Sequence, residues 1–435
     1  MTGLAWFDRL SKSPIARRLA LGALWSIGGT VASRAISLVA SIATARILGK
    51  DGFGEFGIVV NTMGLFLAAA SLGLGLTAMK YVAVFRHQDP ARAARIASLT
   101  VMVSAVAGLV AALALAGSAS WMATRVLGAP GLEGALRASA LGLLFSSVSG
   151  AQAGALAGFG AFRAIAASSV LGAVIGLPFI VAGAARFGVE GAVWGTSISL
   201  AVGCAVAGVA QRRIAGVLAA GQTGSPTHAD WSLFWRFSLP AFLSSGATPL
   251  VSWITAAMLV NRPQGYAEMG LWNAANQWFT SLLFLPTALA QVVLPALAER
   301  LSLGDRSRAG RLLLAATGVN AALALVPAAA GIAASAVIMG LYGESFREGW
   351  GALAVSLGAA ALFALQAPSA QLVEAAGHMW ARLAITLFWS AVVVGMTVLF
   401  LDNGASGLAW ARAVGYAASG VCLGVAAAHI ARSAG

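Results

Sequence analysis

Arg34 lies in the middle of residues 22–45, an apolar run long enough to cross a bilayer as a helix. A helix rises 1.5 Å per residue, so about 20 residues span the roughly 30 Å hydrocarbon core. A guanidinium at that depth costs about 2.5–3.5 kcal/mol, which a partner, a water-filled cavity or a substrate must offset. Because its planar fork can grip two phosphate oxygens, Arg34 is the first candidate for binding an anionic substrate. A structural arginine, satisfied by carbonyls or a neighbouring Glu, is the alternative.

Two further arginines are candidates for the same chemistry. Arg412 is the other cation that falls inside a predicted span, and intramembrane cations often mark substrate paths. Pairing with Asp402 is the alternative that we weigh for Arg412. Arg46 directly follows the first predicted span, where it either binds a charged head group or anchors the helix.

Amide and aromatic side chains gather at the start of a later apolar run. Asn273, Asn276, Gln277 and Trp278 form the densest polar cluster inside a predicted span, and the equivalent position in the first half holds Asn61. Residues three and four apart share one face of a helix, so we expect this face to line a sugar-binding site. Polar contacts between helices, which are common in membranes, are the alternative.

Glu374 is the acid that lies within a span rather than at its mouth. It is a candidate for coupling transport to a proton or Na⁺, and the alternative is a pair with Arg382 or His378. The sequence has no HExxH, Walker or GxSxG motif, each of which would indicate hydrolytic chemistry. We therefore expect a non-enzymatic protein with no cofactor and no metal.

The composition is that of an integral membrane protein. Of the 435 residues, 59% are hydrophobic and 9% are charged, whereas soluble domains carry about 25% charged residues. The net charge of +13 comes from 27 Lys and Arg residues that lie mainly in short segments between apolar runs. Such segments set membrane topology, so nucleic acid is not an expected partner.

Hydropathy predicts an all-α protein with twelve transmembrane helices. The predicted spans are 21–45, 53–78, 96–118, 137–159, 164–185, 189–210, 237–260, 268–297, 312–336, 350–376, 383–401 and 405–428. Most Lys and Arg residues between spans fall on the side shared by both termini. The positive-inside rule then places both termini in the cytoplasm.

The second half of the chain repeats the first. The segment GFGEFG at 52–57 recurs as GYAEMG at 265–270, and Gly188 recurs as Gly404 at a similar separation. Several matches at nearly one offset indicate duplication. Six spans per half is an even number, so the repeat is parallel, with an axis along the membrane normal. The prediction is two six-helix lobes around a central cavity.

These patterns divide the chain into four parts. Residues 1–20 form a basic amphipathic segment, and 21–210 form the first lobe. Residues 211–236 are polar and rich in Gly, Ser and Thr, as expected of a cytoplasmic linker, and 237–435 form the second lobe.

Several stretches resemble a known family. The pieces that carry the resemblance are ARILG at 45–49, GFGEF at 52–56, SLGLG at 71–75, FSLP at 237–240 and LYG at 341–343. They resemble bacterial polysaccharide-biosynthesis flippases of the O-antigen and exopolysaccharide type. These belong to the multidrug/oligosaccharidyl-lipid/polysaccharide (MOP) exporter superfamily. The drug exporters of this superfamily often have an acid in span one, where this chain has Arg34.

The resemblance implies a function in the bacterial inner membrane. An undecaprenyl-pyrophosphate-linked sugar or oligosaccharide would move from the inner to the outer leaflet, with membrane lipids, a polysaccharide polymerase and glycosyltransferases as partners. O-antigen, and hence lipopolysaccharide, is one product that this implies. A cation-coupled multidrug exporter is the second reading, and a scaffold subunit of a polysaccharide synthase is the third.

Overall fold

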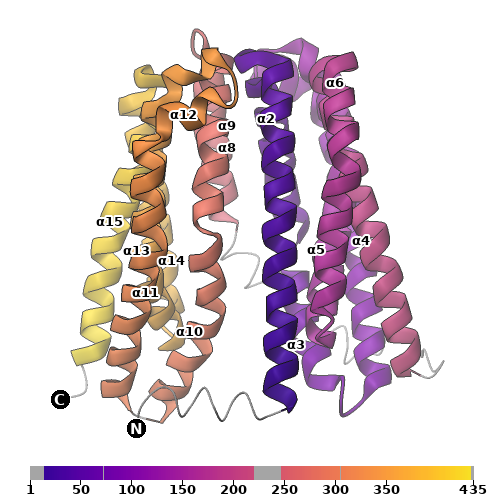
Figure 1. Ribbon diagram of the computed structural model, residues 1–435, viewed down its shortest axis with the longest axis vertical. Helices are drawn as coiled ribbons and strands as arrows, with labels where there is room; N and C mark the ends of the chain where they lie inside the picture. Colours follow the sequence, from indigo (N-terminus) through magenta and orange to yellow (C-terminus); the bar gives the residue numbers. More distant parts are fainter. Residues whose placement is uncertain (1–13, 72, 220–245, 304, 433–435) are drawn as a thin grey trace. The chain divides into compact units, whose positions relative to one another are not determined.

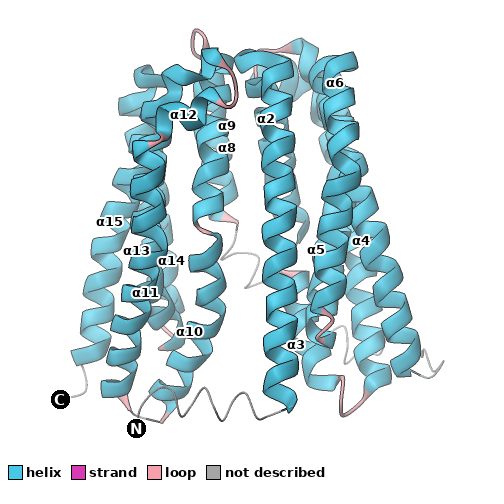
Figure 2. Cartoon of the chain, in the orientation of Figure 1, coloured by secondary structure: helices cyan, strands magenta, loops and turns pink. Residues whose placement is uncertain are grey.

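The computed structural model describes residues 14–71, 73–219, 246–303 and 305–432. Within these ranges the chain is made of helices and short turns, with no strand (Figures 1 and 2). The predicted amphipathic segment up to residue 13, and the predicted linker from residue 220, lie outside the described residues. An all-α fold is thus confirmed for the described part of the chain.

The chain forms two compact units, of which the first comprises Met1–Thr44 and Val59–Gly246. Its helices are α2 (Pro14–Ser71, in part), α3 (Leu74–Phe85), α4 (Pro90–Trp121), α5 (Glu133–Phe159) and α6 (Phe162–Ala219). Helix α5 packs against α3, α4 and α6. Helix α6 continues to Ala219, so the first residues of the predicted linker are helical.

Small and polar residues make the close contacts of the first unit. The Ser147 hydroxyl of α5 donates to the Ser104 carbonyl of α4 at 3.0 Å, and a side chain at Gly108 would overlap Ser147. Such contacts are how helices associate in membranes, where burial of apolar surface gives no driving force.

The second unit comprises Ala45–Ile58 and Ala247–Gly435. Its helices are α8 (Ala247–Val260), α9 (Gly265–Leu282), α10 (Phe284–Ser302), α11 (Arg306–Ala333), α12 (Ser335–Gly340), α13 (Trp350–Ala375), α14 (Met379–Phe400) and α15 (Gly404–Arg432). Helix α13 packs against α9, α10, α11 and α15, so it holds the place in this unit that α5 holds in the first. The short segment Ala45–Ile58 of α2 groups with this unit although its chain neighbours belong to the other.

Eight helical ranges in the described chain are long and apolar enough to cross a membrane. Three of them, Gly28–Ser71, Phe162–Val217 and Met379–Ile430, have 44, 56 and 52 residues, whereas one pass needs about 20. The first two contain non-helical glycines, Gly49 and Gly188, at which the helix bends. The count of twelve spans stays a prediction.

Backbone geometry supports the internal duplication. Gly188 has φ 60° and ψ −138°, and its repeat partner Gly404 has φ 58° and ψ −135°. These values lie in a region that essentially only glycine adopts. Gly128 and Gly343 also both have positive φ, at nearly the same separation. The backbone turn has therefore been kept in both halves, although the flanking side chains differ.

Gly404→Ala should destabilise the protein. The backbone conformation alone costs a non-glycine residue about 1–3 kcal/mol, and the new Cβ would overlap the Glu268 carboxylate. That carboxylate accepts a 2.7 Å hydrogen bond from the Ala405 N–H at the start of α15. We expect a lower thermal unfolding midpoint in detergent. Gly358→Ala, on α13 with open space around it, is the control and should leave the midpoint unchanged or raise it; equal midpoints for both variants would contradict the argument.

Candidate functional site

The second unit contains a cavity of about 580 Å³, within the size range of small-molecule sites. Helices α9, α10, α13, α14 and α15 all contribute to its wall. Most lining groups are apolar, and the polar ones include Gln366, Gln371, Glu374 and Arg382. The cavity is therefore amphipathic, with polar groups in an otherwise hydrocarbon wall.

Four aromatic rings pack together at one part of this wall. Tyr416 stacks on Phe279 with ring centroids 6.2 Å apart, and on Trp389 at 5.6 Å. Phe363 meets the Tyr416 ring edge-on at 5.2 Å. Such pairs add about 0.5–1.5 kcal/mol each beyond the area that they bury. The cluster fixes the side of the cavity next to α9 and α15.

Arg412 lies behind this aromatic cluster. Its guanidinium carbon is 4.2 Å from the centroid of Trp272 and 4.4 Å from that of Phe279, and its Nη1 donates to Asn276 Oδ1 at 2.8 Å. The alternative of a pair with Asp402 is wrong, because Asp402 pairs with Arg262 at 3.2 Å. In the described chain the positive charge is therefore held by ring faces and an amide, without a carboxylate.

The contact with Arg412 also orients Asn276. A guanidinium can only donate hydrogen bonds, so the oxygen of the Asn276 amide must face it. The Nδ2 group, with its two N–H donors, is then directed elsewhere. Arg412 thus makes Asn276 a donor toward any ligand that reaches this face of α9.

Asn276→Asp should lower transport without lowering stability. The new carboxylate would pair with Arg412 and cancel its charge, and the attraction between the two opposite charges is added to the existing hydrogen bond. We expect at least a tenfold loss of transport of an anionic substrate in proteoliposomes, with an unchanged or higher unfolding midpoint. Asn261→Asp, the same change at an exposed position just after α8, is the control. Full transport by Asn276→Asp would show that the charge of Arg412 is not used.

The rest of the predicted polar face of α9 makes different contacts. Asn273 Nδ2 donates to the Phe53 carbonyl at 3.2 Å, which is the helix-to-helix contact expected of the structural alternative. Trp278 is half-buried, and its Nε1 has no partner among the described residues. The Gln277 side chain is also half-buried. The face thus divides into a structural end at Asn273 and an end at Asn276 that meets Arg412.

The segment Ala45–Ile58 is held to the rest of the second unit by polar contacts. Arg46 Nε donates to the Leu341 carbonyl at 2.6 Å, and Lys50 Nζ pairs with Glu348 at 2.6 Å. Arg46 therefore attaches this segment to the residue before Tyr342, which agrees with the anchoring role, one of the two roles expected for it.

Aromatic and glycine contacts complete this attachment. The Phe53 ring lies about 6 Å from the rings of Tyr342 (6.2 Å) and Phe346 (6.0 Å). A side chain at Gly54 would overlap the Tyr266 carbonyl. The two copies of the repeated motif, at 52–57 and 265–270, therefore touch each other.

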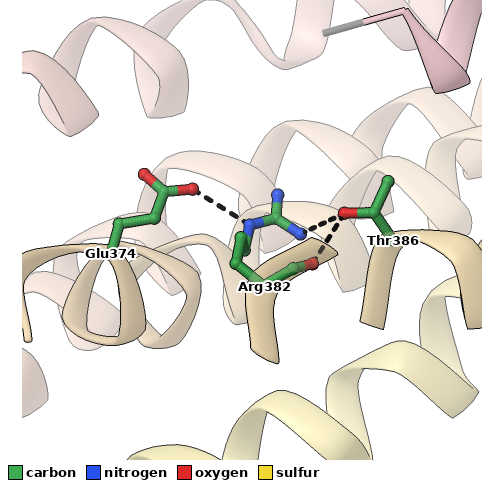
Figure 3. A network of polar contacts seen from close by, with 3 residues as sticks. All are labelled: Glu374, Arg382 and Thr386. Atoms are coloured by element: carbon green, nitrogen blue, oxygen red, sulfur yellow. Dashed lines mark hydrogen bonds and ion pairs between the residues drawn. The ribbon is translucent and has the colours of Figure 1, made fainter. Parts of the chain in front are cut away.

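Glu374 is paired. Arg382 Nε donates to Glu374 Oε1 at 2.9 Å, and Arg382 Nη1 donates to Thr386 Oγ1 at 2.9 Å (Figure 3). The Glu374 and Arg382 side chains are each about one third exposed, at 31% and 32%. This is the pairing expected if Glu374 is structural, and its role in coupling stays a prediction. All three residues line the cavity.

The other two predicted site residues belong to the first unit. Arg34 is exposed on α2, and Asn61 is half-buried further along the same helix. The structure therefore brings Asn276 and Arg412 together in one unit and places Arg34 and Asn61 in the other. Sequence reasoning missed the rings of Phe363, Trp389 and Tyr416. The spacing of Tyr416, four residues after Arg412, is the signal that could have found the cluster.

Comparison with solved structures identifies the class of fold. An inward-facing multidrug resistance MATE family transporter of the MOP superfamily matches with a TM-score of 0.75 and 18% identity, covering 92% of this chain and 95% of that chain. A MOP superfamily transporter from Pyrococcus furiosus matches with a TM-score of 0.68 and 16% identity, covering 96% and 95%. The chain thus shares the fold of these two solved structures.

Sequence comparison identifies the family. Residues 19–300 match the family described as polysaccharide biosynthesis protein, and this chain belongs to it. A relative in Ralstonia nicotianae, the EPS I polysaccharide export inner membrane protein EpsE, is 27% identical over 433 residues, covering 96% of this chain and 93% of the relative. The protein of the same name in Ralstonia solanacearum is 25% identical over 410 residues, covering 91% of each. The resemblance inferred from the sequence, to a family of polysaccharide-biosynthesis proteins, is confirmed.

Proposed function

We propose that this protein exports polysaccharide as a flippase. It moves an undecaprenyl-pyrophosphate-linked sugar or oligosaccharide from the inner to the outer leaflet of the bacterial inner membrane by alternating access. The names of the Ralstonia relatives support the export of a polysaccharide across an inner membrane. The lipid-linked form of the substrate is what the resemblance to polysaccharide-biosynthesis flippases implies.

The charge of the second unit's site carries the proposal. Glu374 and Arg382 in the cavity wall cancel each other, and Arg412 adds a positive charge directly behind the aromatic cluster. A net positive site favours a pyrophosphate and disfavours the organic cations that drug exporters carry.

The parts of the substrate suit different residues. Arg34 is the first unit's candidate for contact with the pyrophosphate, through charge-assisted hydrogen bonds, which gain strength at low dielectric. Asn276 and Gln277 supply amide groups for sugar hydroxyls, and Trp278 offers an aromatic face. A polymerase and glycosyltransferases would make and use the substrate on either side of the membrane.

A leaflet assay tests the proposed function. Purified protein in proteoliposomes should move an undecaprenyl-pyrophosphate-linked glycan to the opposite leaflet, where an added glycosidase can reach it. Protein-free vesicles, and vesicles with a heat-inactivated sample, set the background. Movement no faster than this background would overturn the proposal.

A cation-coupled multidrug exporter is the second candidate, because the fold matches that of a multidrug resistance MATE family transporter. It predicts efflux of a lipophilic cation driven by a proton or Na⁺ gradient. Efflux of ethidium from the same vesicles, together with no movement of the glycan lipid, would favour this candidate.

A further inference from the structure

The cavity of the second unit has a mainly hydrocarbon wall. Leu283 and Leu294 line it from the α9–α10 region, Ala367 from α13, Ile385 from α14 and Leu423 from α15. About 580 Å³ is roughly nineteen times the liquid volume of one water. The space suits a short stretch of an apolar chain better than a whole lipid.

Many of the polar lining groups already have partners within the protein. Ser419 Oγ donates to Gln366 Oε1 at 3.1 Å. The Thr287 hydroxyl donates to the Leu283 carbonyl at 2.9 Å, and that of Thr386 donates to the Arg382 carbonyl at 3.0 Å. These groups therefore offer few free hydrogen bonds to a ligand.

This wall discriminates between a sugar and a hydrocarbon. Each sugar hydroxyl that gives up water without finding a partner costs about 1–3 kcal/mol. Binding of a hydrocarbon chain is instead favourable by roughly 25 cal/mol for each Å² of apolar surface that leaves water. The aromatic faces of Phe363 and Tyr416 add contact area for a branched, unsaturated chain.

Polar groups in the same wall suit the head group of such a chain. Arg382 binds Glu374 through Nε and Thr386 through Nη1, which leaves its Nη2 donors for a phosphate oxygen. Trp389 is 8% exposed, and its Nε1 donor has no partner among the described residues. Both residues line the cavity, but the Trp389 Nε1 atom is itself buried, so Arg382 is the donor that a phosphate reaches.

We propose that this cavity binds the head-proximal part of a polyprenyl phosphate chain, with the phosphate toward Arg382. The inference rests on the proposed function, because it names where the lipid carrier is held. The sugar then lies outside this cavity, and its recognition belongs to other residues such as Asn276.

Binding to purified protein tests the inference, with undecaprenyl phosphate as the probe and native mass spectrometry as the readout. Ala367→Trp fills the cavity and should weaken binding at least tenfold. Ala384→Trp, an exposed position on α14, should bind as the unaltered protein does. If Ala367→Trp does not give folded protein by size exclusion, Ala290→Leu, a smaller change in the same wall, replaces it.

The head group is tested separately. Arg382→Gln should weaken undecaprenyl phosphate about tenfold but leave undecaprenol, which has no phosphate, unchanged. Unaltered binding of the phosphate by the cavity-filling variant would overturn the inference. So would equal displacement by phosphatidylglycerol, which indicates a general lipid site, or displacement by a soluble glycan, which indicates a sugar site. If the protein binds undecaprenyl phosphate in this cavity but does not move the glycan lipid in the leaflet assay, the proposed function is wrong and the binding site stands.

Discussion

Arg34→Ala should abolish glycan-lipid transport while leaving expression and membrane insertion intact. The substitution removes a cation from the middle of an apolar helix, where each charge-assisted hydrogen bond to a substrate contributes about 1.5–3 kcal/mol. Removing two such bonds to a pyrophosphate should therefore lower the transport rate at least a hundredfold. Initial rates in the leaflet assay, normalised to protein in the vesicles, measure the effect.

Two matched variants separate the charge of Arg34 from its geometry. Arg34→Lys keeps the charge but not the planar fork, so we expect partial activity. Arg137→Ala removes an exposed arginine of the same unit that pairs with Glu133 near the start of α5, and it should transport normally. Normal transport by Arg34→Ala would remove this residue from the mechanism.

Joining residues 50 and 348 with a short bifunctional reagent should stop transport. Lys50 Nζ and Glu348 Oε1 are 2.6 Å apart, and both side chains are partly exposed. The segment Ala45–Ile58 groups with the second unit, while its chain neighbours Thr44 and Val59 belong to the first. If transport proceeds by the alternating access proposed above, movement of the two units strains or releases this segment, and a covalent bridge then prevents its release.

The experiment uses Cys at positions 50 and 348 in a background in which Cys204 and Cys422 are replaced by Ala. A bismaleimide should reduce transport to background, whereas a cleavable bis-thiosulfonate should do so reversibly, with recovery on adding reductant. Each single-Cys variant, treated in the same way, controls for modification alone. Transport that continues in a fully bridged sample would mean that the segment stays attached through the cycle.

The attachment of this segment could not be predicted from hydropathy. The apolar runs at 21–45 and 53–78 place residues 45–58 within the first half of the chain. Its contacts with Leu341, Tyr342 and Glu348 come from residues almost 300 positions away. Only side-chain packing, through Phe53 and the glycines beside it, decides which unit holds it.

The sequence by itself determined the membrane class, the all-α fold and the duplication, because these follow from properties local to the chain. A long apolar run must satisfy its backbone hydrogen bonds internally and so becomes a helix. Gly188 and Gly404 adopt the same backbone turn because both repeats lack a side chain there.

Tertiary structure decided the partners of the charged side chains. Asp402 is close to Arg412 along the chain, yet it lies before the turn at Gly404 and pairs with Arg262 instead. Arg412 meets Asn276 and two rings of α9, more than 130 residues earlier in the sequence. Distance along the chain fixes which turn of a helix carries a charge, but only the packing of neighbouring helices fixes what that charge faces.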